Sequence, residues 1–234
     1  MKNVCIIPAR GGSKRIPRKN IKLFYNKPII AYSIEAALNS ECFDKIIVST
    51  DDEEIAGVAN EYGAETPFIR PEELANDYTP TVPVIKHAIN WLSTHDDKPD
   101  NVCCIYATAP FITAKIIQEA FVLMQNNNAG YCFTAAKFSF PIQRAFKILE
   151  NSRVAMFQPE NYNARSQDLD LAYQDAGQLY WGKSFSFLDE KPFLSEISVP
   201  YILPSYLVQD IDTLDDWEMA EILFRLLKER NYDI

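Results

Sequence analysis

Residues 8–20 contain the side chains of this sequence with the most evident chemistry. Around Gly11 and Gly12, the segment gathers five cationic side chains, Arg10, Lys14, Arg15, Arg18 and Lys19. The chain as a whole has a net charge of -9, so these cations are concentrated against the overall balance. Charges of one sign repel one another unless an anion lies among them. The cluster therefore predicts a local anion site, and a phosphate chain is the anion that we expect.

The residues before this segment indicate how it is positioned. Residues 4–7 form a short apolar run typical of a buried parallel strand, so the loop should leave the strand at its carboxyl end. Gly11 and Gly12 can take backbone angles closed to other residues, which would turn successive N–H groups toward an anion. The spacing matches neither a Walker A loop nor the G-x-G-x-x-G fingerprint. A solvated basic loop is the alternative, but the glycine pair and the strand exit favour a phosphate site.

Two acidic residues near the end of the chain form a second candidate. Asp210 and Asp212 are two residues apart, just before a predicted helix at about 214–229. In extended backbone such residues point to the same side, so their carboxylates can jointly hold a hard divalent cation, of which Mg2+ is the natural one. Helix capping competes with this interpretation, because Asp212 or Thr213 could cap the helix, with Asp215 and Asp216 in its first turn. Beside a triphosphate loop, the metal site is the stronger interpretation.

Other polar segments carry weaker signals. Residues 51–54 precede a predicted helix, and we interpret their four acidic side chains as a cap and helix-dipole charges. Arg70 and residues 77–81 follow an apolar run at 66–69, where polar groups could edge a nucleobase at the carboxyl side of a sheet. Residues 165–167 and 175–178 are polar and lie late in, or just past, an irregular segment. Ordinary surface loops are an open alternative for these groups.

Composition excludes several classes of protein. With 234 residues, 47% hydrophobic and 24% charged, the chain is typical of a globular protein with a sizeable core. Its pI near 4.8 argues against a nucleic-acid partner, because such binding depends on broad neutralisation of phosphates. The five cysteines form no C-x-x-C pair and mostly lie in apolar runs, which indicates a reducing compartment. No signal peptide is visible and no apolar run approaches the ~18 residues of a membrane span, so we expect a cytoplasmic protein without a membrane partner.

The alternation of sequence patterns predicts the fold. Apolar runs at 4–7, 46–49, 66–69 and 102–106 alternate with helical patterns at 28–38, 53–62, 82–94 and 114–125. This alternation is typical of an α/β fold, with a mostly parallel, Rossmann-like sheet and helices on both faces. After a strand at 131–134 the pattern breaks over about 137–175, an insertion whose aromatic residues need a partner surface such as self-association provides. Strands at 178–181 and 199–203 and the terminal helix complete a single domain, residues 1–234.

Together, these motifs resemble the CMP-sialic acid synthetase family, cytidylyltransferases that activate nine-carbon 2-keto sugar acids. The resemblance spans nearly the whole chain and rests on IPARGGSK (7–14) with KN (19–20), KP (27–28), IVSTDD (47–52), EYGAE (61–65), FIRP (68–71) and DIDT (210–213). Within the family, RSQD (165–168) and YQDAGQ (173–178) are most similar to the branch that acts on pseudaminic acid. Where sialic acid synthetases carry LQPTSP and NGA, this chain has IYATAP (105–110) and DAG (175–177). Tyr106 thus replaces a glutamine implicated in sugar contact, as expected for a changed acceptor.

The resemblance implies a reaction and a role for each matched residue. The anomeric hydroxyl of the sugar would attack the α-phosphorus of CTP, giving pyrophosphate and a CMP-sugar for surface-glycan or flagellin glycosylation. The catalytic residues would be Arg10 and Lys19, which hold the triphosphate, and Asp210 and Asp212, which bind Mg2+. Asn20 would contact the ribose of the nucleotide, and Arg70, Thr79 and Thr81 would contact its cytosine. The other nucleotide contacts would be Ala9, Gly11, Gly12, Ser13 and Lys14. The sugar would contact Tyr106, Thr108, Arg165, Gln167, Asp175 and Gln178. The family's arm, here about 137–175, reaches over a partner subunit, which implies a homodimer with composite sites.

Three rival interpretations follow from the same residues. A nucleotide-sugar glycosyltransferase also uses a D-x-D pair to bind a metal, but it needs no cationic loop after the first strand. A noncatalytic nucleotide-binding protein would bind CTP without turnover, against which Arg10, Lys19 and the two aspartates argue. Within the enzyme class, a synthetase for sialic or legionaminic acid is the nearest competitor, because an epimer changes only a few hydrogen bonds in a pocket.

Overall fold

A single sheet organises the molecule. A computed structural model describes residues 1–232 and 234, and within them six strands form one sheet in the order β10-β6-β9-β5-β1-β4. Neighbouring strands run parallel except beside β9, which is antiparallel to both β5 and β6. The strands are β1 (Asn3–Pro8), β4 (Lys45–Ser49), β5 (Asn101–Ile105), β6 (Tyr131–Lys137), β9 (Tyr173–Lys183) and β10 (Ser198–Leu203). The predicted mostly parallel sheet is confirmed.

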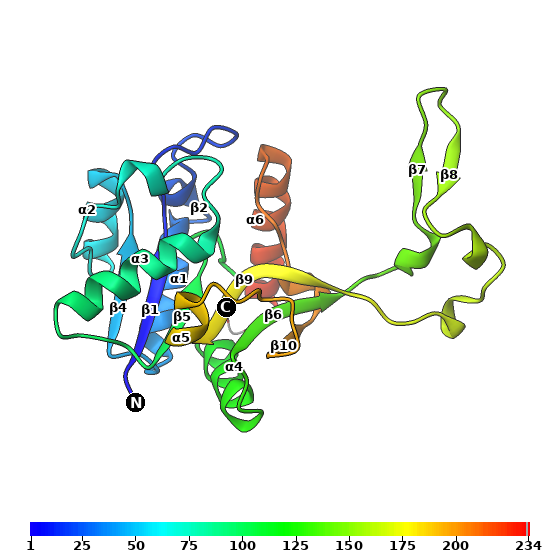
Figure 1. The fold of residues 1–234 in the computed structure, drawn as a ribbon. Helices are drawn as coiled ribbons and strands as arrows, with labels where there is room; N and C mark the ends of the chain where they lie inside the picture. Colours follow the sequence, from blue (N-terminus) through cyan, green and yellow to red (C-terminus); the bar gives the residue numbers. More distant parts are fainter. Residues whose placement is uncertain (233) are drawn as a thin grey trace.

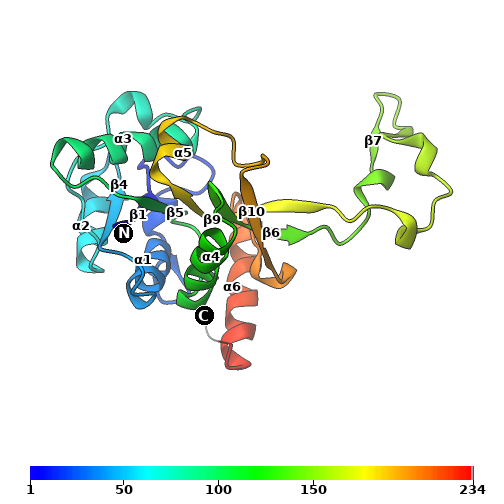
Figure 2. The same ribbon diagram turned by 60° about the horizontal axis from the view of Figure 1, so that its bottom comes forward.

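Helices cover both faces of the sheet. They are α1 (Ile29–Asn39), α2 (Glu53–Glu61), α3 (Thr81–Thr94), α4 (Ala114–Asn126), α5 (Ser184–Leu188) and α6 (Leu214–Glu229). Figure 2 shows α1, α4 and α6 on one side of the strands and α3 and α5 on the other. Within the described residues, no helix has the length and apolar character needed to cross a membrane.

The alternation of side chains along β1 explains these layers. Successive residues of a strand point to opposite faces. Val4 and Ile6 therefore belong to the core cluster beneath α3, whereas Cys5 and Ile7 belong to the cluster beneath α1. All four side chains are fully buried. This double burial is what a continuous apolar run predicts for a parallel strand.

One predicted strand is wrong. Residues 66–69 form no strand, and the segment touches the sheet only through isolated bridges from Ile47 to Glu65 and from Thr50 to Ile69. Pro67 lies between these two bridges and has no N–H to donate to a ladder. The segment still follows the edge of the sheet beside β4 and brings Arg70 to its carboxyl end, because the Arg70 N–H donates to the Thr50 carbonyl at 2.8 Å.

The predicted insertion is a long arm. Between β6 and β9 the chain extends away from the sheet and then returns to it (Figure 1). The hairpin of β7 (Phe146–Ile148) and β8 (Val154–Met156) lies on this arm, well away from the sheet. Large apolar side chains lie open on it; the most exposed are Phe140, Phe146, Ile148, Val154, Phe157, Tyr162 and Leu171. The segment after β6 thus departs from the sheet, as its irregular pattern indicates, and its association with a partner subunit stays a prediction.

The segment between β1 and α1 is tied to the far end of the chain. It runs through the cationic loop, a 3-10 turn at Lys19–Ile21 and a short hairpin of β2 (Leu23–Phe24) and β3 (Lys27–Pro28). Phe24 is fully buried and meets Trp217 and Phe224 of α6 edge-on, with ring centroids 5.5 and 5.4 Å apart. This packing brings the residues just before α6 next to the loop after β1.

Candidate active site

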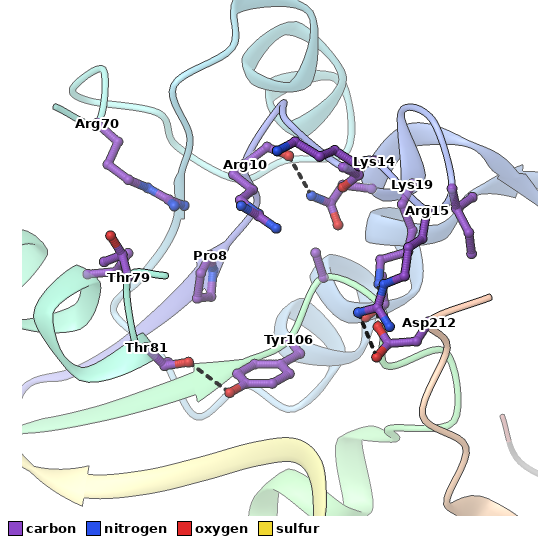
Figure 3. Close-up of a pocket in the computed structure, with 16 residues that line it drawn as sticks. Pro8, Arg10, Lys14, Arg15, Lys19, Arg70, Thr79, Thr81, Tyr106 and Asp212 are labelled. Carbon is purple, nitrogen blue, oxygen red and sulfur yellow. Dashed lines mark hydrogen bonds and ion pairs between the residues drawn. The ribbon is translucent and has the colours of Figure 1, made fainter. Parts of the chain in front are cut away.

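A cavity of about 280 Å3 opens where β1 and β5 end. Its lining includes both predicted catalytic cations and one predicted metal ligand (Figure 3). The lining residues are Pro8, Arg10, Ser13, Lys14, Arg15, Ile16, Lys19, Asn20, Arg70, Thr79, Thr81, Val84, Tyr106, Ala107, Thr108 and Asp212. The carboxyl edge of a parallel sheet is where open α/β folds bind ligands, so the position agrees with the prediction.

Arg15 and Lys19 contact the acidic residue that precedes α6. The Asp212 carboxylate pairs with Arg15 Nη2 at 2.8 Å and with Lys19 Nζ at 3.4 Å. Lys19 Nζ also donates to the Ile211 carbonyl at 2.7 Å. The structure therefore brings the cationic loop into contact with the D-x-D segment, almost two hundred residues later in the chain.

Helix capping does not account for Asp210 and Asp212. Thr213 is the N-cap of α6, and it forms a capping box with Asp216. The Thr213 hydroxyl accepts from the Asp216 N–H at 3.2 Å, and Asp216 Oδ2 accepts from the Thr213 N–H at 2.8 Å. The carboxylates of Asp210 and Asp212 therefore take no part in capping, and that of Asp212 pairs with Arg15 and Lys19. Burial, with the charge of Asp212, raises the pKa of Asp210, which is the electrostatic condition that a bound cation relieves.

The glycine pair serves a different purpose from the one predicted. The Gly11 N–H donates to Asp51 Oδ1 at 2.9 Å instead of facing the cavity, and neither glycine has a positive φ. A Cβ on Gly11 would lie 2.7 Å from Asp52 Oδ2, whereas a Cβ on Gly12 would meet nothing within 4 Å. Gly11 is therefore required for close approach to the start of α2, and an inward-facing nest of N–H groups is not formed here.

Arg18 does not join the anion site. Its guanidinium forms two hydrogen bonds with the Asp52 carboxylate, at 2.5 and 2.8 Å, and also pairs with Glu54. The hydrogen bond from Arg18 lowers the pKa of Asp52 to about 2. Asp52 also caps α2 by accepting from the Ile55 N–H at 3.0 Å, so the predicted capping role of the acidic run is confirmed. Arg18 contributes to loop structure, because it anchors the loop to this helix start.

Among the other residues at the end of β1 and in the loop, only some line the cavity. Asn20 is buried and its Nδ2 donates to the Arg10 carbonyl at 2.9 Å, which fixes the loop backbone beneath the Arg10 side chain. The Ala9 N–H donates to the Ser49 carbonyl and continues the β1–β4 pairing. Ala9, Gly11 and Gly12 do not line the cavity, so their predicted contact with a nucleotide stays a prediction.

The opposite wall carries the predicted base contacts. Arg70 is only 4% exposed, its Nε donates to Ser49 Oγ at 3.1 Å, and it also donates to the Ser49 carbonyl. Burial lowers the pKa of Arg70 to about 10. Thr81 begins α3, and its hydroxyl is 2.8 Å from the hydroxyl of Tyr106. Together with Thr79 these groups present hydrogen-bonding atoms from segments that lie apart in the sequence.

The predicted sugar contacts fall into two groups. Tyr106 and Thr108 line the cavity. Gln178 is a buried residue of β9, and its Nε2 donates to the Leu207 carbonyl at 2.7 Å. Asp175, also in β9, accepts from the Tyr180 hydroxyl at 2.9 Å. Neither of these two residues lines the cavity.

Two other predicted sugar contacts lie on the arm. Arg165 donates to Asp168 at 2.7 Å within a short turn there, and Gln167 is exposed beside it. The arm extends away from the body in both ribbon views, so Arg165 and Gln167 do not reach the cavity of their own chain (Figures 1 and 2).

Comparison with known proteins identifies the family. The family described as cytidylyltransferase matches residues 4–197. A pseudaminic acid cytidylyltransferase of Campylobacter jejuni is 49% identical over 229 residues, which cover 98% of this chain and 99% of that protein. The chain belongs to the cytidylyltransferase family. The predicted family and the predicted enzyme class are confirmed.

More distant relatives agree with this assignment. A CMP-N,N'-diacetyllegionaminic acid synthase of Legionella pneumophila is 33% identical over 98% of this cytidylyltransferase and 99% of its own length. Among solved structures, a CMP:2-keto-3-deoxy-manno-octonic acid synthetase in complex with CTP covers 97% of this chain and 99% of its own, with a TM-score of 0.69 and 16% identity. That similarity confirms the predicted α/β fold.

Two side chains that pair with charged residues of the cavity in this cytidylyltransferase were not predicted as site residues from the sequence. Arg15 was counted in the cationic cluster but given no site role, and it pairs with Asp212. Asp77 was noted only as part of a polar segment, yet it pairs with Arg10 and Lys14. The charge of Asp77 was visible in the sequence, but its position opposite the loop depends on the fold of residues 71–80.

Proposed function

We propose that this cytidylyltransferase converts CTP and pseudaminic acid into CMP-pseudaminic acid and pyrophosphate. The observation that carries the proposal is the convergence of Arg10, Lys14, Arg15 and Lys19 on one cavity beside Asp212. Four cations at the end of a buried strand match the charge of a triphosphate. The acceptor is inferred from the 49% identity to a protein named for pseudaminic acid, over nearly the whole of both chains.

The reaction is an attack by the anomeric hydroxyl of the sugar on the α-phosphorus. A bond forms between that oxygen and phosphorus, the hydroxyl loses its proton, and the bond to the pyrophosphate oxygen breaks. Catalysis of nucleotidyl transfer depends chiefly on alignment and on neutralising charge. Arg10, Lys14 and Lys19 supply that charge where the β- and γ-phosphates leave.

Asp210 and Asp212 fit a magnesium site. Their carboxylates are hard oxygen ligands two residues apart. Neither caps α6, because Thr213 and Asp216 form its capping box. Within the described residues, no group of three or more His, Cys, Asp and Glu side chains forms a cage. Mg2+ commonly binds through one or two carboxylates together with substrate phosphates, and when bound it would withdraw charge from the reacting phosphate.

The wall formed by Arg70, Thr79 and Thr81 receives the cytosine in this proposal. These residues stand across the cavity from Lys19 (Figure 3). Burial and the Ser49 contacts hold Arg70 in one orientation, so it can present a fixed pattern of donors to the base. Asn20 also lines the cavity, and in this proposal it contacts the ribose.

The arm suggests a homodimer with composite sites. Its large exposed apolar side chains, such as Phe140 at 82% and Ile148 at 73%, favour burial against another surface. In such a dimer the arm of one chain would carry Arg165 and Gln167 to the site of the other. A cytoplasmic location belongs to the same proposal, and the buried free thiols of Cys5, Cys103, Cys104 and Cys132 agree with a reducing compartment.

Pyrophosphate release tests the reaction. The protein is incubated with Mg2+ and CTP and with pseudaminic, legionaminic or N-acetylneuraminic acid separately, and ATP, GTP and UTP serve as nucleotide controls. We expect release only with CTP and pseudaminic acid. Release with another acid would keep the chemistry and overturn the acceptor, and no release from folded protein with any of the three would overturn the proposed reaction.

A further inference from the structure

Two acidic residues pair with the four cations of the cavity, two cations each. Asp212 pairs with Arg15 and Lys19, as described above. Asp77 pairs with the other two: its Oδ1 is 2.5 Å from Arg10 Nη1 and its Oδ2 is 2.6 Å from Lys14 Nζ. Both oxygens of the Asp77 carboxylate are therefore engaged, each with a different cation.

The turn that carries Asp77 is built by its neighbour. Asn76 Oδ1 accepts from the N–H groups of Tyr78 and Thr79 at 2.9 and 3.0 Å, and Asn76 Nδ2 donates to the Glu73 carbonyl at 2.8 Å. The Thr79 hydroxyl donates to the same carbonyl at 3.2 Å. These bonds define the backbone of the turn on both sides of Asp77, so the carboxylate is directed at the loop while Thr79 faces the cavity.

We propose that Asp77 is a resident competitor of the triphosphate, which occupies two of its cations until CTP displaces it. This inference rests on the proposed function, because it takes Arg10 and Lys14 as phosphate ligands. A carboxylate and a phosphate use the same donors and carry charge of the same sign, so Arg10 and Lys14 cannot serve both fully. Asp77 thereby lowers nucleotide affinity, and it can pair with Arg10 and Lys14 again once pyrophosphate has left.

The exposure of the ion pairs of Asp77 allows a bound triphosphate to break them reversibly. The side chains of Asp77 and Arg10 are about one-third exposed, and that of Lys14 is 81% exposed. Exposed ion pairs are weak, so a triphosphate can break them, at the cost of a several-fold loss in affinity. The hydrogen bonds from Lys14 and Arg10 lower the pKa of Asp77, so pairing with these cations favours its charged form.

The test measures the binding of CTP, pyrophosphate and CMP to the full chain by calorimetry. Asp77→Asn keeps the shape of the side chain and removes its charge. We expect this variant to bind CTP and pyrophosphate about 3- to 10-fold more tightly than the unaltered protein, the range set by two exposed ion pairs. The gain should be smaller for CMP, which lacks the outer phosphates, and should shrink at about 0.5 M salt because salt screens exposed charges.

Glu72→Gln is the matched control, since it removes one negative charge from the same segment at an exposed position. Its affinities should stay near those of the unaltered protein. Equal CTP affinity in Asp77→Asn and the unaltered protein, or weaker affinity in Asp77→Asn, would overturn the competitor role. So would an equal gain in Glu72→Gln, which would show a general charge effect. Failure of the unaltered protein to bind CTP at all would instead overturn the proposed function.

Discussion

The cationic cavity and the arm differ in how completely one chain builds them. The cavity has its cations, Asp212 and the wall of Arg70, Thr79 and Thr81 in place within a single chain, held by the ends of β1 and β5 and by the start of α6. The arm presents Arg165 and Gln167 on an exposed turn, far from that cavity (Figure 1). Nucleotide binding should therefore be a property of one chain, whereas acceptor binding should depend on assembly. Four substitutions can break or sharpen this contrast.

Asp210→Ala should give the largest loss. Removing one of two carboxylates that would hold Mg2+ takes charge stabilisation from the transition state, and we expect turnover to fall at least about 100-fold. The measurement is pyrophosphate release under saturating CTP, with thermal unfolding to show that the fold is intact. Asp215→Ala removes a nearby acidic side chain from the first turn of α6 and should change turnover little. Normal turnover in Asp210→Ala would remove the metal role.

Gly11→Ala should damage the cationic cavity by way of its structure. The new Cβ would lie 2.7 Å from Asp52 Oδ2 and 3.0 Å from Asp52 Cβ, while Arg18 and the Ile55 N–H hold that side chain in place. We expect the free energy of unfolding to fall by about 1–3 kcal/mol, with weaker CTP binding. Gly12→Ala is the control, because its Cβ meets nothing within 4 Å. Equal stability of the two variants in denaturant titration would contradict the steric explanation.

The parts of the molecule that could be predicted from sequence are those whose structure is determined by residues close together in the chain. Apolar runs and helical periods predicted most of the sheet and its helices, and the charges of the loop and of Asp212 indicated where the cationic cavity lies. The strand expected at 66–69 failed because Pro67 removes a ladder donor, and the purpose of Gly11 depends on Asp52, which only the fold brings near. Arg18 was indistinguishable by type from its neighbours, and its partners at the start of α2 are set by tertiary structure.

Arg165→Ala should separate the two regions most clearly. Arg165 lies on the arm, and in a composite dimer it would meet the acceptor bound to the other chain. We expect the KM for the sugar acid to rise about tenfold, because one charge-assisted hydrogen bond to the sugar acid is lost. The Kd for CTP should stay unchanged. Arg153→Ala, at another exposed arm position, should leave both values near normal. If Arg165→Ala weakened CTP binding as strongly as sugar binding, the division of labour between cavity and arm would be wrong.

Tyr106→Gln should have the smallest effect and falls on the boundary between the two regions. Tyr106 lines the cavity, its hydroxyl is 2.8 Å from that of Thr81, and its ring centroid is 5.5 Å from that of Tyr180. Burial raises its pKa to about 12, so the hydroxyl is neutral and can both donate and accept.

Because pocket polar groups set acceptor choice, Tyr106→Gln should lower the kcat/KM ratio of pseudaminic to N-acetylneuraminic acid about 3- to 10-fold, with little change in CTP binding. Tyr106→Phe, which removes only the hydroxyl, shows whether that group or the ring makes the selection. An unchanged ratio in Tyr106→Gln would mean that acceptor choice is made elsewhere, and the arm would then be the first place to search.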